Sequence, residues 1–181
     1  SFGGAIHPRV ALIYNLKTTT FKLLYGEAFR APNTFELFLS EDEDNVTPRL
    51  KPETIKSYEF IVEHLFGKHL RASAAGYYYT LDGLISQTTD PESGYILIHN
   101  AETIKAKGLE FELTGHWESD VEGRLSYAMQ EAHNSKTGKT LTNSPHHMVK
   151  FSLMAPLFQD RLFVGLETRY QSERETLAGK Q

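Results

Sequence analysis

The sequence of 181 residues has no cysteine, no long apolar run and no run of basic residues. The lack of cysteine excludes disulfide frameworks, thiolate metal sites and cysteine nucleophiles. No segment approaches the ~20 consecutive apolar residues of a membrane-spanning helix, which excludes a helical membrane protein. With a formal net charge of -4, the chain also lacks the basic footprint of a nucleic-acid-binding protein, so no nucleic acid is expected as a partner.

Signatures of known enzyme and metal sites are missing as well. The patterns G-x-S-x-G, H-E-x-x-H and G-x-G-x-x-G do not occur. Residues 138–140 are similar to the end of a phosphate-binding loop, but His133 stands where its leading glycine would be. The adjacent His146 and His147 would point to opposite faces of a strand, and the acidic run 40–45 lacks the spacing of a calcium loop. We therefore expect no catalytic residue, no metal site and no cofactor.

The sequence has a dominant period of two, which predicts strands. In 121–130, apolar side chains alternate with Glu, Arg, Ser and Gln, and 107–117 and 161–170 repeat this pattern. Aromatic residues make up 12% and are spread along the chain, which also suits strands. We predict an almost all-β chain of about eight strands with the following ranges: 10–16, 20–26, 57–66, 70–85, 95–117, 121–133, 146–155 and 161–171.

Short and long connections alternate between these strands, as in an up-and-down meander with tight turns at one end and long loops at the other. This asymmetry is typical of bacterial outer-membrane barrels. The range 95–117 exceeds the ~9–11 residues of a crossing strand, and a turn near 101–103 could divide it. We expect one long strand that projects above the bilayer, because dividing the range would move later long loops to the opposite end from the earlier ones. Alternation alone leaves a soluble barrel or sandwich open.

Several motifs in a fixed order resemble those of one family. The segment 25–37 reads YGEAFRAPNTFEL. The box HPR at 7–9 precedes it, and the later boxes are LKPET at 50–54, SYE at 57–59, YYY at 77–79, NAE at 100–102, KGLE at 107–110 and NSPHH at 143–147. In this order they resemble the barrel of TonB-dependent outer-membrane receptors.

The resemblance implies a fragment of an antiparallel transmembrane barrel that has about 22 strands in the family. Residues 1–181 are expected to form a single partial barrel, without the plug domain, the TonB-binding segment, the early strands and the closing strands. No charged-then-apolar leader is seen at Ser1, so a leader was removed or the segment was excised.

The implied function is import of a scarce large ligand, such as a ferric siderophore or cobalamin, across the outer membrane of a Gram-negative bacterium. The implied partners are TonB, through the missing N-terminal part, and outer-membrane lipid. No histidine lies between Arg30 and Pro48, which counts against haem. A soluble β-sheet binding or adhesion module is the alternative.

The resemblance also directs attention to individual residues. Pro32 fixes a corner where a strand leaves for a long loop, and Arg30 offers a planar fork with Glu36 and Glu53 as candidate carboxylate partners. Trp117 is expected in an interfacial girdle. The candidate ligand-binding residues are Arg30, Asn33, Phe35 and Glu36. The family-box residues expected to be structural are Phe29, Pro32, Glu53, Gly108 and Glu110.

Overall fold

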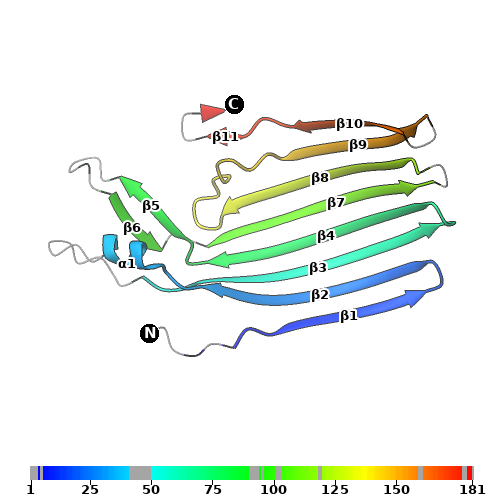
Figure 1. Ribbon diagram of the computed structural model, residues 1–181. Helices are drawn as coiled ribbons and strands as arrows, with labels where there is room; N and C mark the ends of the chain where they lie inside the picture. Colours follow the sequence, from blue (N-terminus) through cyan, green and yellow to red (C-terminus); the bar gives the residue numbers. More distant parts are fainter. Residues whose placement is uncertain are drawn as a thin grey trace.

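The computed structural model describes residues 4, 6–40, 50–89, 94, 96–100, 103–117, 120–158, 161–176 and 179–180. Its main element is an eight-stranded antiparallel sheet with the order β1-β2-β3-β4-β7-β8-β9-β10 (Figure 1). The strands of this sheet are β1 (Arg9–Leu16), β2 (Thr19–Arg30), β3 (Glu53–Phe66), β4 (Leu70–Asp82), β7 (Ile104–His116), β8 (Glu122–Asn134), β9 (His147–Leu157) and β10 (Leu162–Gln171). The remaining elements are α1 (Thr34–Ser40), the β5 (Ile85–Thr89) and β6 (Ile96–Asn100) hairpin, and the short pair β11 (Glu175–Thr176) and β12 (Gly179–Lys180).

The two ends of the sheet differ, as the alternation of short and long connections predicts. The tight turns gather at one end, the turn end, whereas α1 and the β5–β6 hairpin extend from the other, the loop end (Figure 1). Several tight turns contain a residue in the left-handed region, such as Lys17, with φ 51°, and Gly67, with φ 66°. The meander of about eight strands is therefore confirmed.

The two faces of the sheet differ in chemistry, because side chains alternate along every strand. Lys22, Glu63 and Glu112 lie on one face, the polar face. The other, the apolar face, carries large exposed hydrophobic side chains on all eight strands. They include Leu12, Leu23, Phe60, Tyr78, Leu109, Leu125, Leu153 and Leu166.

The apolar face is not folded into a core of its own. In the described part of the chain, the buried hydrophobic residues are Leu50, Ile98, Ile104, Ala106 and Ala132, and none of them belongs to the apolar face. A sheet that leaves this much apolar surface uncovered needs an apolar environment or a partner. In the part of the chain that the structure describes, the large apolar side chains are therefore not enclosed in a compact globule, the arrangement of a soluble sandwich.

The apolar band has the height that a bilayer requires. On β3 it extends from Tyr58 to Phe66, and on β4 from Tyr78 back to Leu70. These stretches match the ~9–11 residues with which a tilted strand crosses the hydrocarbon region. Trp117 closes the band at the turn end, where its ring lies over Gly115 and approaches Gly123. Among the described residues, no helix is long and apolar enough to cross a membrane.

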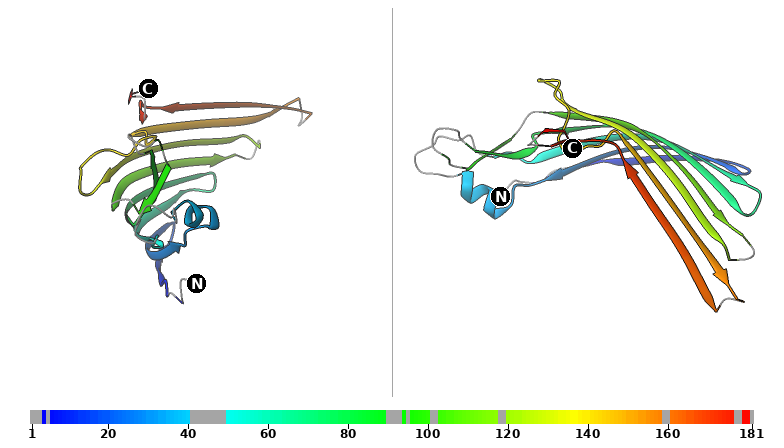
Figure 2. Two further views of the ribbon diagram at one scale, coloured as in Figure 1. Left: turned by 90° about the vertical axis from the view of Figure 1, so that its left-hand side faces the viewer. Right: turned by 90° about the horizontal axis from the view of Figure 1, so that it is seen from above.

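The sheet is curved and open (Figure 2). Its outermost strands, β1 and β10, each pair on one side only. The prediction of an incomplete, curved sheet is confirmed.

Two strand predictions were wrong. The range 95–117 is not one strand, because β6 pairs only with β5 while β7 joins the main sheet between β4 and β8. The range 70–85 is broken too, at Gly83, whose φ of +69° suits glycine. Because the two predicted strands are both divided, the chain forms an additional hairpin, β5–β6, that leaves the loop end and returns to it. The later long loops therefore remain at the loop end. The expectation that a division would move these loops to the opposite end was therefore wrong, because it did not include a second division at Gly83.

The loop end contains further differences from the sequence-based expectation. Strands β2 and β3 continue to Arg30 and back to Glu53, beyond the predicted limits at Gly26 and Ser57. The short helix α1, of seven residues, follows β2, and the period of two in the sequence did not predict it. The acidic stretch 41–45 lies outside the described residues, as do Tyr95 and the 101–102 part of the expected turn.

Candidate functional site at the loop end

Arg30 and Glu53 form the polar centre of the loop end. Arg30 is the last residue of β2, Glu53 is the first of β3, and the two are opposite each other in register. Arg30 Nε donates to Glu53 Oε2 at 2.7 Å, and Nη2 donates to Oε1 at 2.8 Å. This two-pronged geometry is the strong form of an arginine–carboxylate pair. The Glu53 side chain is 8% exposed, whereas that of Arg30 is 45% exposed.

The electrostatics of this pair are favourable to the charged forms. Both residues lie beyond the apolar band, at the last register position of β2 and β3. The Arg30 guanidinium hydrogen bonds hold the pKa of Glu53 below its usual range, against the opposing effect of burial. The same bonds, with those that Arg30 donates to Glu36, raise the pKa of Arg30. Glu53 also accepts a hydrogen bond from the backbone N–H of Ile85 at 2.7 Å, which reaches the start of β5.

Glu36 joins Arg30 to the start of α1. Arg30 Nη1 donates to both carboxylate oxygens of Glu36, at 3.0 Å each. Glu36 Oε2 accepts from the backbone N–H of Asn33 at 2.8 Å, and Asn33 Oδ1 accepts from the backbone N–H of Glu36 at 2.8 Å. This reciprocal pair is a capping box with asparagine as the N-cap, and it starts the helix directly after Pro32.

Asn100, the last residue of β6, connects two more segments. Its Oδ1 accepts from the backbone N–H of Lys51 at 2.8 Å, and its Nδ2 donates to Lys51 O at 2.9 Å and to Gly83 O at 2.7 Å. A single side chain thereby joins the return from the α1 loop to the base of the β5–β6 hairpin. Nearby, Thr103 Oγ1 donates to Asp82 Oδ1 at 2.7 Å, at the facing ends of β4 and β7.

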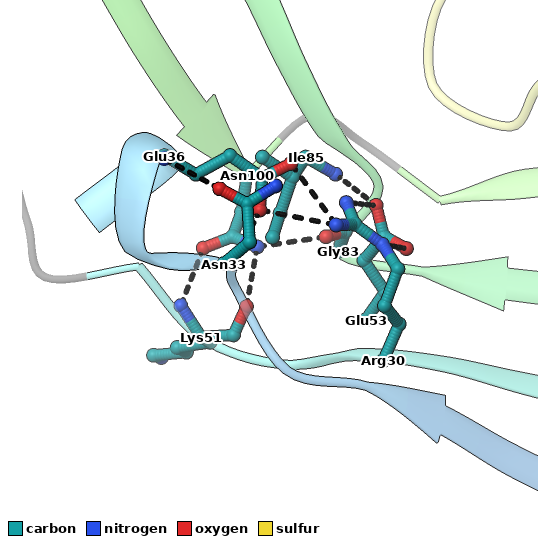
Figure 3. Close-up of polar contacts among 8 residues, drawn as sticks. All are labelled: Arg30, Asn33, Glu36, Lys51, Glu53, Gly83, Ile85 and Asn100. Carbon is teal, nitrogen blue, oxygen red and sulfur yellow. Dashed lines mark hydrogen bonds and ion pairs between the residues drawn. The ribbon is translucent and has the colours of Figure 1, made fainter. Parts of the chain in front are cut away.

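These contacts form two neighbouring sets of hydrogen bonds, one centred on Arg30 and one on Asn100, which together we call the junction network and show in Figure 3. Its members are Arg30, Asn33, Glu36, Lys51, Glu53, Gly83, Ile85 and Asn100. The network ties the 31–52 connection and the β5–β6 hairpin to the ends of β2 and β3. The network holds the loop segments in place: its charged side chains are paired, and its side chains form hydrogen bonds with backbone groups of the loops.

The residues singled out from the sequence have different places at the loop end. Both candidate partners of Arg30 are confirmed as its contacts, and Pro32 is buried. Phe35 is 65% exposed, and Phe29 stacks on His7 with 4.6 Å between ring centroids. A role of these residues in ligand binding stays a prediction.

The polar face below the junction network carries paired charges. Lys22 Nζ lies 2.9 Å from Glu63, and Glu112 contacts Arg71 at 3.4 Å and Arg124, whose Nε donates to it at 2.9 Å. These groups lie toward the turn end of the face. Since surface pairs of this kind contribute little stability, their main effect is to make the face wettable.

Gly108 and Glu110 belong to the polar face as well. The ring of Tyr77 lies over Gly108, and its hydroxyl donates to Gln130 Oε1 at 3.3 Å. A Cβ on Gly108 would stand 2.5 Å from the Tyr77 ring and 2.7 Å from Met129 O, so only glycine fits there. Glu110 is opposite Ala75 and Ala128 in register and is exposed.

Comparison with known families decides what kind of chain this is. Residues 1–180 match the family described as TonB dependent receptor-like, beta-barrel. The chain belongs to the TonB-dependent receptor family. The match covers the whole described part of the barrel wall, so the family resemblance read from the motif boxes is confirmed.

Solved structures of TonB-dependent receptors have the same fold. The chain superimposes on Pseudomonas aeruginosa FpvA bound to heterologous pyoverdines with a TM-score of 0.71 and 19% identity, over 93% of this chain and 23% of that one. For the alcaligin outer-membrane receptor FauA of Bordetella pertussis the TM-score is 0.65 with 24% identity, over 92% and 29%. For the FrpB iron transporter of Neisseria meningitidis it is 0.70 with 14% identity, over 93% and 27%.

The chain thus spans about a quarter of the length of these receptors. At these identities the likeness establishes the fold alone. No curated protein sequence matches the chain closely enough to add to the comparison.

Part of the junction network was missed in the sequence, although signals for it exist. The capping box is visible as Asn33-x-x-Glu36 directly after a proline. The break at Gly83 is visible as Asp-Gly, a turn signal inside an alternating run. The contact of Asn100 with Lys51 has no local signal, since the two residues are far apart in sequence and meet only through the sheet order.

Proposed function

We propose that this chain is part of the barrel wall of an outer-membrane receptor that imports a scarce large ligand with energy delivered through TonB. Family membership carries the proposal. Two features of the sheet support it: an uncovered apolar face of bilayer height, and a polar face with paired charges suited to a water-filled interior. The location that follows is the outer membrane of a Gram-negative bacterium, with the loop end outside the cell, and the role is transport rather than catalysis.

An iron chelate is the ligand class that we favour, with cobalamin as the second candidate. Relatives of the same fold are described as an iron transporter and as an alcaligin receptor. The direct test is uptake by cells that carry or lack the gene of the full-length receptor, with radiolabelled ferric chelates and cobalamin compared in TonB-positive and TonB-negative strains. Loss of chelate uptake in both the receptor deletion and the TonB-negative strain supports the proposal. A full-length protein found in the aqueous phase would refute it and favour a soluble binding module.

Within the loop-end candidates, Phe35 is the one we propose for direct ligand contact. All three guanidinium nitrogens of Arg30 already donate to Glu53 or Glu36, and Asn33 forms the helix cap. Phe35 is 65% exposed, and its apolar side chain takes part in none of these hydrogen bonds. Phe35→Ala should therefore weaken ligand binding by about tenfold while barrel assembly stays normal.

The matched control is Phe158→Ala, because Phe158 is also exposed and lies at the turn end, away from the loops. Equal ligand affinities of the two variants in the full-length receptor would remove Phe35 from the site.

A further inference from the structure

A hollow in the apolar face lies at Gly76, in the middle of the sheet. It has a volume of about 600 Å³, and apolar side chains from four strands line it: Leu23, Phe60, Leu109 and Met129. In register, Gly76 stands between Phe60 and Leu109, so the missing side chain leaves the space that its neighbours border. A Cβ on Gly76 would be 3.3 Å from Leu109 Cδ2. The part of the hollow around Gly76 suits a hydrocarbon chain, because these four side chains offer no hydrogen bond to water.

The loop side of this hollow is bordered by tyrosines and then by lysines, all on the apolar face. Tyr58 and Tyr78 line it, together with Lys107. One register row further toward the loops are Lys56 and Lys105, on either side of Thr80 on β4. With strands ~4.8 Å apart, the backbones of these two lysines are roughly 10 Å from each other. From the middle of the sheet toward the loop end, the apolar face thus presents first the hollow, then the two tyrosines, and then the lysines.

The charges of this rim are open to an added anion. Lys107 pairs with Glu131 at 3.1 Å, but the two side chains are 63% and 59% exposed. Lys56 lies 3.7 Å from Glu27. Lys105 has no ion pair within the described residues, and its register neighbour on β8 is His133. Exposed pairs of this kind are weak and exchange readily, so a multivalent anion can compete for the lysines.

We propose that this hollow and its lysine rim form a binding site for a phosphorylated, acylated glycolipid of the outer leaflet, with an acyl chain at Gly76 and a phosphate at Lys105 and Lys107. The inference rests on the proposed outer-membrane location, which places the loop end and its lysines at the outer-leaflet headgroups. Charge complementarity selects this occupant: zwitterionic lipid would fill the hollow equally well but would gain little from the lysines. A protein partner would need a wide face rather than a single groove.

The test measures lipid binding to the full-length receptor in detergent micelles, with phosphorylated lipid A and its dephosphorylated form as probes. Native mass spectrometry reads the bound fraction of each. The wild-type receptor should bind the phosphorylated form more tightly, and Lys105→Gln with Lys107→Gln should cut that binding by about fivefold per lysine. Gly76→Leu fills the hollow and should weaken both forms alike.

Matched controls lie on the polar face. Lys150→Gln removes a lysine, and Gly165→Leu adds the same side chain to a glycine that has open space around it. Both should bind like the wild type. Equal binding of the two lipid forms, or lysine variants that bind like Lys150→Gln, would overturn the proposal. Since ligand uptake is measured separately, its failure would count against the proposed transport function and not against the lipid site, whereas a full-length protein outside the outer membrane would overturn both.

Discussion

Replacing Glu53 by glutamine tests whether the Arg30–Glu53 pair holds the loops to the sheet. The substitution keeps the shape of the side chain and removes its charge, so Arg30 loses a two-pronged carboxylate. Exposed ion pairs contribute ~0–1 kcal/mol, and breaking a buried one costs ~3–5 kcal/mol. Because Glu53 is almost buried and Arg30 is half-exposed, we expect a loss of about 2 kcal/mol in the free energy of local opening.

The assay is hydrogen exchange at the backbone N–H of Ile85, which donates to the Glu53 carboxylate. A loss of about 2 kcal/mol corresponds to an exchange rate roughly 30-fold faster for the full-length receptor in micelles. Amides in the middle of β3 should keep their rates, because their ladder on both sides is intact.

The control is Glu167→Gln, since Glu167 pairs with Arg169 while both side chains are more than half exposed. It should leave exchange at Ile85 unchanged. If Glu53→Gln also leaves that rate unchanged, or if both variants raise it equally, the pair does not anchor the hairpin and the reasoning is refuted.

Three further predictions concern the same end of the sheet and the polar face. Because Arg30 lowers the pKa of Glu53, the protection that this pair gives should be complete above the ordinary glutamate pKa of ~4.3 and be lost as pH falls through the lowered value; exchange measured across acid pH checks this. Asn33→Ala removes the helix cap and should cost about 1 kcal/mol, seen as faster proteolysis of the loop, whereas Asn33→Asp should retain protection. Gly108→Ala forces Tyr77 away and meets backbone, so it should destabilise the barrel by about 1–3 kcal/mol, seen as a lower unfolding temperature; an unchanged temperature would contradict the packing.

Most of the sheet could be predicted from the sequence, because the period of two in hydrophobicity matches the alternation of side chains between the apolar and polar faces. In the middle of β7, β8 and β10, apolar and polar side chains alternate, as expected where one face of a sheet meets an apolar medium and the other a polar one. A slip by one residue would exchange the two faces, so the register is strongly determined. The limits of β8 and β10 therefore fell within a residue of the predicted ranges.

The loop end could not be predicted in the same way because side-chain-to-backbone bonds, not periodicity, determine it. At 70–85 the Asp82-Gly83 pair is the only local signal of a break, and the positive φ of Gly83 divides the strand there. Helix α1 is too short to show a helical period, and its start depends on the Asn33–Glu36 box. The sequence contained these signals, but each is weak without knowledge of the segment it contacts.

The junction network explains why motif boxes that are far apart in sequence occur together in one chain. Arg30 ends β2 and Glu53 begins β3, so antiparallel pairing alone brings the first two boxes together. Asn100 arrives from the other side, because the β5–β6 hairpin folds back over the connection that contains Lys51. An arginine without its carboxylate, or a hairpin without its asparagine, would leave charged or backbone groups unsatisfied at that end. The boxes are therefore coupled through shared hydrogen bonds, and a substitution in one should be compensated only by a change in the box that it contacts.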